Sequence, residues 1–106
     1  MITIDDFKKC ELVVAQIKEV KEHPNADRLY LVKVDTGTEI RQLVAGIRKS
    51  YTPEQLINRR VIVVKNLQPA VIRGEESCGM ILAATDENGT TLLSVDRDVA
   101  LGSIVK

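Results

Sequence analysis

The sequence is poor in aromatic residues: its 106 residues include one phenylalanine, two tyrosines and no tryptophan. Proteins that bind single-stranded nucleic acid without sequence preference stack successive bases on several aromatic rings. The shortage therefore argues against a general single-strand binder. Any nucleic acid would have to be recognised through backbone charge and shape.

Cysteine and histidine are scarce as well. Cys10 and Cys78 lie in unlike contexts without a C-x-x-C motif, so we expect small core residues in a reducing compartment, with a disulfide between them left open. His23 is the single histidine and lies in a turn, where it is expected to cap local backbone. No histidine or cysteine joins the acidic pairs in the spacing of a metal site, so no metal is predicted.

Motifs that would anchor catalysis are absent, including the phosphate-binding loop, the dinucleotide-binding glycines and the nucleophile elbow. We therefore predict a non-catalytic protein without a cofactor. No apolar run approaches the roughly 20 residues of a membrane span. The start of the chain also lacks the basic and apolar regions of a signal peptide, which makes a cytoplasmic protein the expectation.

Charge is balanced overall but not along the chain. The formal net charge is zero, yet the segment from Arg41 to Arg73 has seven positive side chains and one acid, Glu54, a net charge of +6. Local potential, not the total, governs the encounter with a polyanion. The alternative is that these are ordinary solvated surface charges. We expect Arg41, Lys65 and Arg73 to converge on one positive ribbon.

The pattern of β-branched residues and turn residues predicts an all-β fold. Strands are expected over 12–20, 28–34, 39–45, 60–65, 79–85, 91–95 and 102–106, and short helical turns over 4–9 and 52–57. Three strands, a short helix and two more strands is the order of a five-stranded OB-fold barrel, with the short helix between strands 3 and 4 and extra C-terminal strands. We predict a single domain over 1–106, with its core at about 10–85 and an extension over 86–106 that contacts a second copy.

Several polar residues near the expected strand ends allow two interpretations. Asn25 either shapes a turn or contacts a ligand at the barrel rim, and Arg41 with Gln42 marks either a charged edge strand or a phosphate or base contact. Lys65 and Asn66 end the most apolar strand, where they protect an edge or bind.

The segment from 73 to 80 is the end of a donor-rich loop. Arg73 precedes Gly74, and its guanidinium can fork two phosphate oxygens. Ser77 and Met80 flank Gly79 and either pack in the core at a bulge or form a shallow contact surface.

Five spaced stretches carry a resemblance to one family. They are H-P-N-A-D-R-L at 23–29, R-Q-L-V-A-G-I at 41–47, Y-T-P-E-Q-L at 51–56, N-L-Q-P-A with R-G following at 66–74, and S-C-G-M-I-L-A-A at 77–84. Together they resemble the tRNA-binding OB-fold domain, which occurs as a stand-alone dimer and at the C-terminus of methionyl-tRNA synthetases.

The resemblance implies structure-specific, sequence-tolerant binding of tRNA, as a homodimer that assists methionyl-tRNA synthetase or is appended to it. Carried onto matching positions, the tRNA-facing residues are Asn25, Arg41, Gln42, Asn66, Arg73, Ser77 and Met80, to which Lys65 adds a cation where the family is usually uncharged. The alternative is a protein-interaction or chaperone-like OB module.

The chain also departs from the family pattern. The family usually has basic residues where Val13, Gln16, Gln68 and Val71 stand. Each phosphate contact contributes about 0.9 to the slope of log affinity against log salt on a duplex. Fewer cations therefore predict a shallow salt dependence and a modest affinity, on the order of micromolar.

Overall fold

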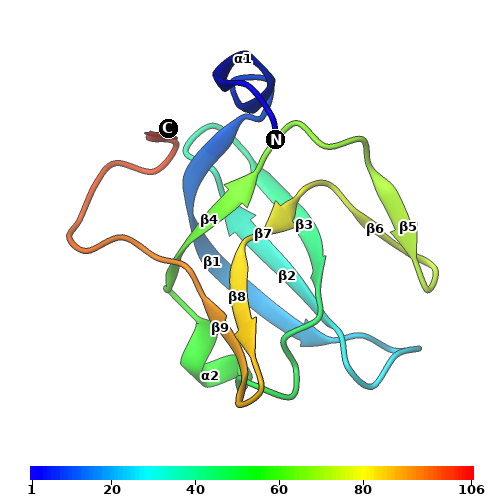
Figure 1. The fold of residues 1–106 in the computed structure, drawn as a ribbon. Coiled ribbons are helices and arrows are strands. Elements are labelled where there is room, and N and C mark those ends of the chain that lie inside the picture. Colours follow the sequence, from blue (N-terminus) through cyan, green and yellow to red (C-terminus); the bar gives the residue numbers. More distant parts are fainter.

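A long first strand organises the fold. The computed structural model describes all residues from Met1 to Lys106. Strand β1 (Leu12–Glu22) pairs antiparallel with β2 (Tyr30–Asp35), β4 (Arg60–Val64) and β10 (Ile104–Val105). Its residues 12–16 face β4 and its residues 16–22 face β2, with a register shift between Ile17 and Glu19. Such an irregularity bends a strand, which lets one sheet curl on itself (Figure 1).

The remaining elements complete a nearly closed barrel. The main sheet has the order β3–β2–β1–β4–β7, with β10 beside β1. The other elements are α1 (Ile4–Phe7), β3 (Ile40–Ala45), α2 (Pro53–Leu56), β5 (Ala70–Ile72), β6 (Glu75–Ser77), β7 (Met80–Ile81), β8 (Ala83–Asp86) and β9 (Gly89–Leu92). The short helix between β3 and β4 and the strand order confirm the predicted OB-like, all-β fold.

Side chains and backbone close the barrel between β3 and the segment that follows β6. The Ser77 hydroxyl accepts a hydrogen bond from the Val44 N–H at 3.0 Å and donates to the Gly79 carbonyl at 3.1 Å. The Cys78 N–H donates to the Gln42 carbonyl at 2.9 Å. A Cβ atom on Gly79 would lie 2.8 Å from the Val64 carbonyl oxygen, so only glycine fits at this close approach.

The strands bury apolar side chains on both faces. Alternate residues of β1 and β4, such as Val61 and Val63, fill the barrel interior. The residues between them form a second cluster of Leu12, Val14, Ile62 and Val64 on the outer side. The C-terminal segment covers this cluster with Val95, Leu101 and Val105. Strand β4 is therefore buried on both faces.

Both short helices begin with a capping box. Thr52 accepts from the Gln55 N–H while the Gln55 side chain accepts from the Thr52 N–H, and Pro53 follows the cap. Thr3 caps α1 in the same way with Asp6. Neither helix has the length or the apolar character that a membrane crossing would need.

Two segments differ from the sequence-based expectation. The donor-rich loop before Met80 contains a β-hairpin, β5–β6, that forms a sheet of its own. The expected strand over 79–85 is divided at Leu82 into β7, which pairs with β4, and β8, which pairs with β9. Cys10 and Cys78 are both free thiols, and because Cys10 is exposed and Cys78 is half-buried, the expectation of two core residues was wrong.

Candidate nucleic-acid interface

The positive residues of the central segment are partly neutralised by acids from outside it. The ion pairs are Arg41 with Glu39, Arg48 with Glu22, and Arg60 with Asp98. Arg59 lies over the Tyr51 ring, 5.6 Å from its centroid. Of the seven cations, Lys49, Lys65 and Arg73 therefore remain without a carboxylate or aromatic partner.

Arg41 is held within the fold. Its Nε pairs with Glu39, and its Nη1 donates to the Lys65 carbonyl at 2.5 Å and lies 3.4 Å from the Cys78 carbonyl. The side chain is 23% exposed. This guanidinium joins the end of β4 to the segment that leads into β7, with its charge balanced beside it.

Three more of the candidate residues also use their polar atoms internally. The Asn66 amide accepts from the Glu11 N–H at 2.8 Å and donates to the Lys9 carbonyl at 2.7 Å, which ties the end of β4 to the N-terminal segment. The Gln42 amide donates to the Glu76 carbonyl at 3.0 Å. The buried Ser77 hydroxyl closes the barrel. These side chains shape the candidate surface from within.

The other four candidates, Asn25, Lys65, Arg73 and Met80, present their side chains outward. Asn25 and Arg73 are exposed and Lys65 is half-buried. Met80 is 47% exposed and lines a largely apolar groove between the β5–β6 hairpin and β7–β8, together with Leu67. Charge and apolar area are thus both available to a partner at this side of the barrel.

The structure divides the cations between two hollows. Lys65 and Arg41 line one, with Gln42 and Cys78. Arg73 lines another, with residues 26–29 of the turn between β1 and β2. The expectation of a single positive ribbon is therefore corrected: Arg41 and Lys65 line a different hollow from Arg73, and Arg41 is neutralised by Glu39.

One of the departures from the family pattern has a simple structural reason. Val13 is 7% exposed and belongs to the barrel core, so no phosphate contact can be missing there. Gln68 and Val71 are exposed on the segment that leads into and forms β5, and Gln16 is half-buried. The count of absent surface cations falls from four to three.

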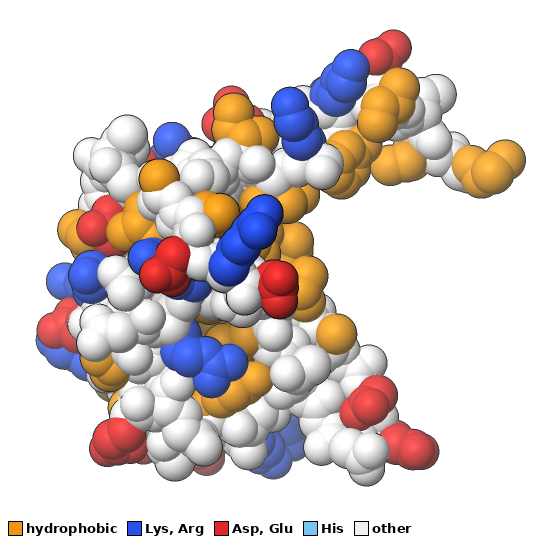
Figure 2. All heavy atoms as spheres, turned by 90° about the vertical axis from the view of Figure 1, so that its left-hand side faces the viewer, with side chains coloured by type: hydrophobic (Ala, Val, Ile, Leu, Met, Phe, Trp, Pro, Cys, Tyr) orange, Lys and Arg blue, Asp and Glu red, His pale blue; other side chains and the backbone are white.

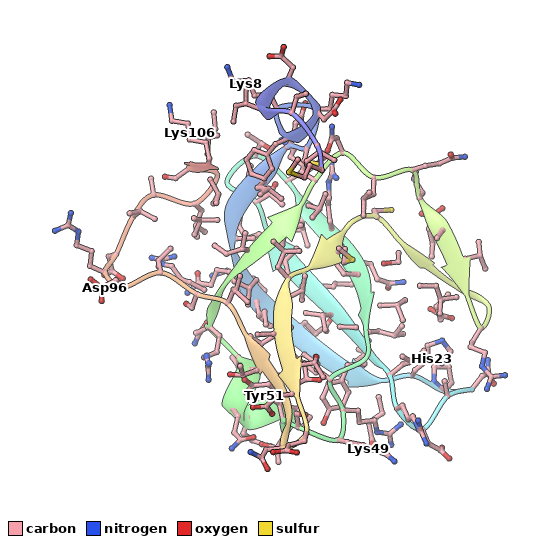
Figure 3. The ribbon with its side chains drawn as sticks, viewed as in Figure 1. Lys8, His23, Lys49, Tyr51, Asp96 and Lys106 are labelled. Carbon is pink, nitrogen blue, oxygen red and sulfur yellow. The ribbon has the colours of Figure 1, made fainter.

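His23 confirms its predicted role and adds a second contact that the sequence did not indicate. Its ring is 3% exposed, and its Nδ1 accepts from the Asn25 N–H at 3.0 Å. Because Nδ1 is an acceptor, the ring proton is on Nε2, which donates to the Ile72 carbonyl at 3.0 Å. The imidazole therefore fastens the 23–29 turn to the tip of the β5–β6 hairpin (Figure 3).

Two titratable groups differ from their ordinary behaviour. The pKa of Tyr51 is lowered because its hydroxyl is hydrogen-bonded by Thr91 and by the Leu92 N–H, with Arg59 nearby. The pKa of the Cys78 thiol is raised, first by burial and then by the adjacent Glu76. Nowhere do three or more histidine, cysteine or acidic side chains gather in a way that could hold a metal ion.

Comparison with known proteins gives one consistent result. A family described as "Putative tRNA binding domain" matches residues 12–104. The chain is 53% identical over 105 residues to a methionine–tRNA ligase of Pyrococcus horikoshii, covering 99% of this chain but 14% of that protein. The chain therefore spans only a small part of the curated relatives that it matches.

Solved structures agree with this match. A MetRS related protein from Pyrococcus horikoshii superposes with a TM-score of 0.93 at 33% identity, covering 100% of this chain and 98% of the other. A CsaA chaperone protein from Picrophilus torridus superposes with a TM-score of 0.93 at 31% identity over 100% of both chains.

Proposed function

This chain belongs to the tRNA-binding domain family, and we propose that it binds folded tRNA through the sugar-phosphate backbone, with little dependence on base sequence. The observation that carries the proposal is the family match over nearly the whole chain. The half-buried Lys65 and the exposed Arg73 supply charge, and Asn25 and Met80 supply polar and apolar contact. Arg41, Gln42, Asn66 and Ser77 hold this surface in shape. We expect it to act in the cytoplasm, where tRNA is used.

The contacts of the three aromatic rings support the proposal that RNA binding depends little on base sequence. Tyr30 is buried and donates to the Tyr51 carbonyl at 2.6 Å. Tyr51 is engaged by Thr91 and Arg59, and Phe7 packs against the outer apolar cluster. None of the three rings is placed to stack on a splayed base, so recognition depends on the shape of a folded RNA.

A titration against several tRNAs tests this proposal. We expect dissociation constants on the order of micromolar that agree within about threefold among tRNAs with different anticodons, and a shallow dependence on salt. An unstructured RNA of equal length is the matched control and should bind at least tenfold more weakly. Equal binding of the unstructured RNA, or a strong preference for one anticodon, would contradict the proposal.

We further propose that two copies associate through an apolar face formed by both ends of the chain. Ile4 is 65% exposed and Ile104 is 76% exposed, and both line one hollow together with Phe7 and Val105. Hydrophobic side chains gather along the projection and inner wall of the recess in Figure 2. A second copy presents the same apolar face, which makes it the matching occupant.

Sedimentation measures this association directly. The variant Ile104→Lys should sediment as a monomer, whereas Val71→Lys, at a site that is 73% exposed on β5, should leave the dimer intact. Two linked binding surfaces raise the effective concentration for one tRNA, so the monomeric variant should also bind tRNA more weakly. A wild-type protein that sediments as a monomer at tens of micromolar would exclude the dimer.

The relatives are the basis for a proposal about which enzyme this tRNA binding serves. A related segment forms 14% of the Pyrococcus horikoshii methionine–tRNA ligase. We therefore propose that this domain delivers tRNA to a methionyl-tRNA synthetase, either appended to it or as a separate subunit, and contributes no catalytic step. Adding the domain in trans should lower the KM for tRNA of a synthetase that lacks one, without raising kcat.

A second candidate function has one observation in its favour. The groove that Met80 lines is largely apolar, and one structural relative, from Picrophilus torridus, is a CsaA chaperone protein. Binding of an unfolded polypeptide segment would use that groove and not the cations. Suppression of aggregation of a denatured protein that is lost in Met80→Asp and unaffected by tRNA would support this alternative.

A further inference from the structure

The turn of the β5–β6 hairpin has an unexpected residue. Its two connecting residues, Arg73 and Gly74, have φ values of +54° and +91°. Consecutive positive φ values are typical of a type I′ turn, in which asparagine followed by glycine is preferred. An arginine in the left-handed region costs roughly 1 kcal/mol relative to residues that tolerate it. The fold alone would therefore favour asparagine or glycine at position 73.

The Arg73 side chain makes no contact within the molecule that would offset the energetic cost of its left-handed backbone. It is exposed, and it takes part in none of the side-chain hydrogen bonds or ion pairs of the structure. Nothing lies within 4 Å of a Cβ placed on the adjacent Gly74, so the turn projects into open space. Strained backbone that the fold does not require is concentrated at functional sites.

A second unpaired arginine lines the same hollow. Arg28 and Arg73 line it together with Ala26, Asp27 and Leu29. Arg28, like Arg73, is exposed and has no ion pair. Two like charges beside one hollow repel each other unless an anion lies between them. Asp27, which lines the same hollow, offsets one of these two charges, so the hollow keeps a net positive charge that suits an anion.

The two sides of the hollow are held in a fixed relation by buried contacts. His23 joins the turn that carries Arg28 to the Ile72 carbonyl, one residue before Arg73. On the other side of the turn, Arg48 donates to the Ala26 carbonyl at 3.3 Å and pairs with Glu22. These tethers hold the two backbone segments that carry Arg28 and Arg73 in a fixed relation, which lowers part of the entropic cost of binding.

We infer that Arg28 and Arg73 form a clamp for a single phosphodiester group of the RNA backbone, with His23 as the positioning residue that keeps its two halves together. This inference rests on the proposed tRNA-binding function and adds to it a residue, Arg28, that the sequence analysis did not select. The forked guanidinium suits phosphate oxygens. Asp27 lines the same hollow, and its carboxylate repels the phosphate, which keeps the net attraction moderate.

The salt dependence of tRNA binding tests the clamp. We expect Arg28→Gln and Arg73→Gln each to weaken binding by about three- to tenfold, in the range of partly exposed charged hydrogen bonds. If both arginines hold one phosphate, the double variant should reduce the slope of log affinity against log salt by about 0.9, not by twice that amount. The losses should also be less than multiplicative, as for residues that share a partner.

A matched control is available on the opposite side of the barrel. Arg97 is exposed and without an ion pair, and it follows Asp96, which lies far from His23 in Figure 3. Arg97→Gln removes the same charge and should leave affinity within twofold. Asp27→Asn should instead strengthen binding by about two- to threefold, because it removes the opposing carboxylate.

One variant separates a binding role from a structural one. Arg73→Asn replaces arginine by a residue that tolerates the left-handed backbone, so it should raise the thermal midpoint. The same change should weaken tRNA binding. A fall in both quantities would assign Arg73 to the fold. If wild-type protein binds tRNA but Arg28→Gln and Arg97→Gln behave alike, the clamp is refuted and the proposed function stands. If the wild type does not bind tRNA at all, both are refuted.

Discussion

Removing the Ser77 hydroxyl should affect stability and tRNA affinity in opposite ways, depending on whether this hydroxyl holds the fold together or binds RNA. Ser77 is 5% exposed, and its hydroxyl both accepts from Val44 and donates to Gly79. Replacing it in Ser77→Ala leaves a donor and an acceptor without partners at the seam between β3 and β7. The change is small in volume, so its effect reports on these two hydrogen bonds.

The magnitude follows from the geometry. An unsatisfied buried polar group costs about 1–3 kcal/mol. Val44 is half-buried, which lets water recover part of its loss, so a total of about 2 kcal/mol is expected. For a chain of this length each kcal/mol shifts the thermal midpoint by about 4 °C, and Tm should therefore fall by roughly 8 °C.

Circular dichroism during thermal and urea unfolding measures this change, at one protein concentration because dimerisation would make Tm depend on it. The urea midpoint should fall while the m-value stays constant. The matched control is Ser94→Ala, whose exposed hydroxyl donates to the Arg60 carbonyl at 2.7 Å. It should cost no more than about 0.5 kcal/mol, as surface substitutions do.

Binding of tRNA well below the midpoint completes the test. Because the Ser77 hydroxyl faces inward, Ser77→Ala should bind tRNA within twofold of wild type. A tenfold loss of affinity with an unchanged Tm would show that this hydroxyl faces the RNA, and our account of the β3–β7 seam would be refuted.

Three other expectations concern backbone and thiol chemistry. Gly79→Ala should destabilise the protein by roughly 3 kcal/mol, because the new methyl group meets the Val64 carbonyl at 2.8 Å and φ is +131° there; urea unfolding checks this. Cys78 should be alkylated by iodoacetamide more slowly than the exposed Cys10 at pH 8, since its raised pKa leaves less thiolate, and the difference should shrink as pH increases; single-cysteine variants measure it. Asn58→Ala should lower the unfolding free energy by about 1 kcal/mol because φ is +68° at this position, whereas Asn58→Gly should be nearly neutral; an equal loss in both variants would contradict this reason.

The parts of the fold predicted from sequence are those with strong local signals. Runs of β-branched residues mark β1 and β4, and the capping residues Thr52 and Pro53 mark α2. The β5–β6 hairpin was missed because its strands have three residues each and its turn has arginine where asparagine is usual. Glu75 and Glu76 also have little preference for strands.

The candidate site was harder to predict, because sequence shows charges but not their partners. The pairing of Arg41 with Glu39 had a signal, since residues two apart on a strand share a face. The pairing of Arg48 with Glu22 had none, because it joins segments 26 residues apart. The burial of Ser77 and the approach of Arg28 to Arg73 likewise depend on how the hairpin packs against the barrel.

The positions of the two chain ends have a practical consequence. Helix α1 and strand β10 line one hollow, and both termini lie at the end of the barrel opposite the helix α2 (Figure 1). A short glycine-rich linker from Lys106 to Met1 would therefore permit circular permutation, with new ends opened in the exposed β8–β9 connection. Such a rearranged chain could be immobilised through that connection for single-molecule work.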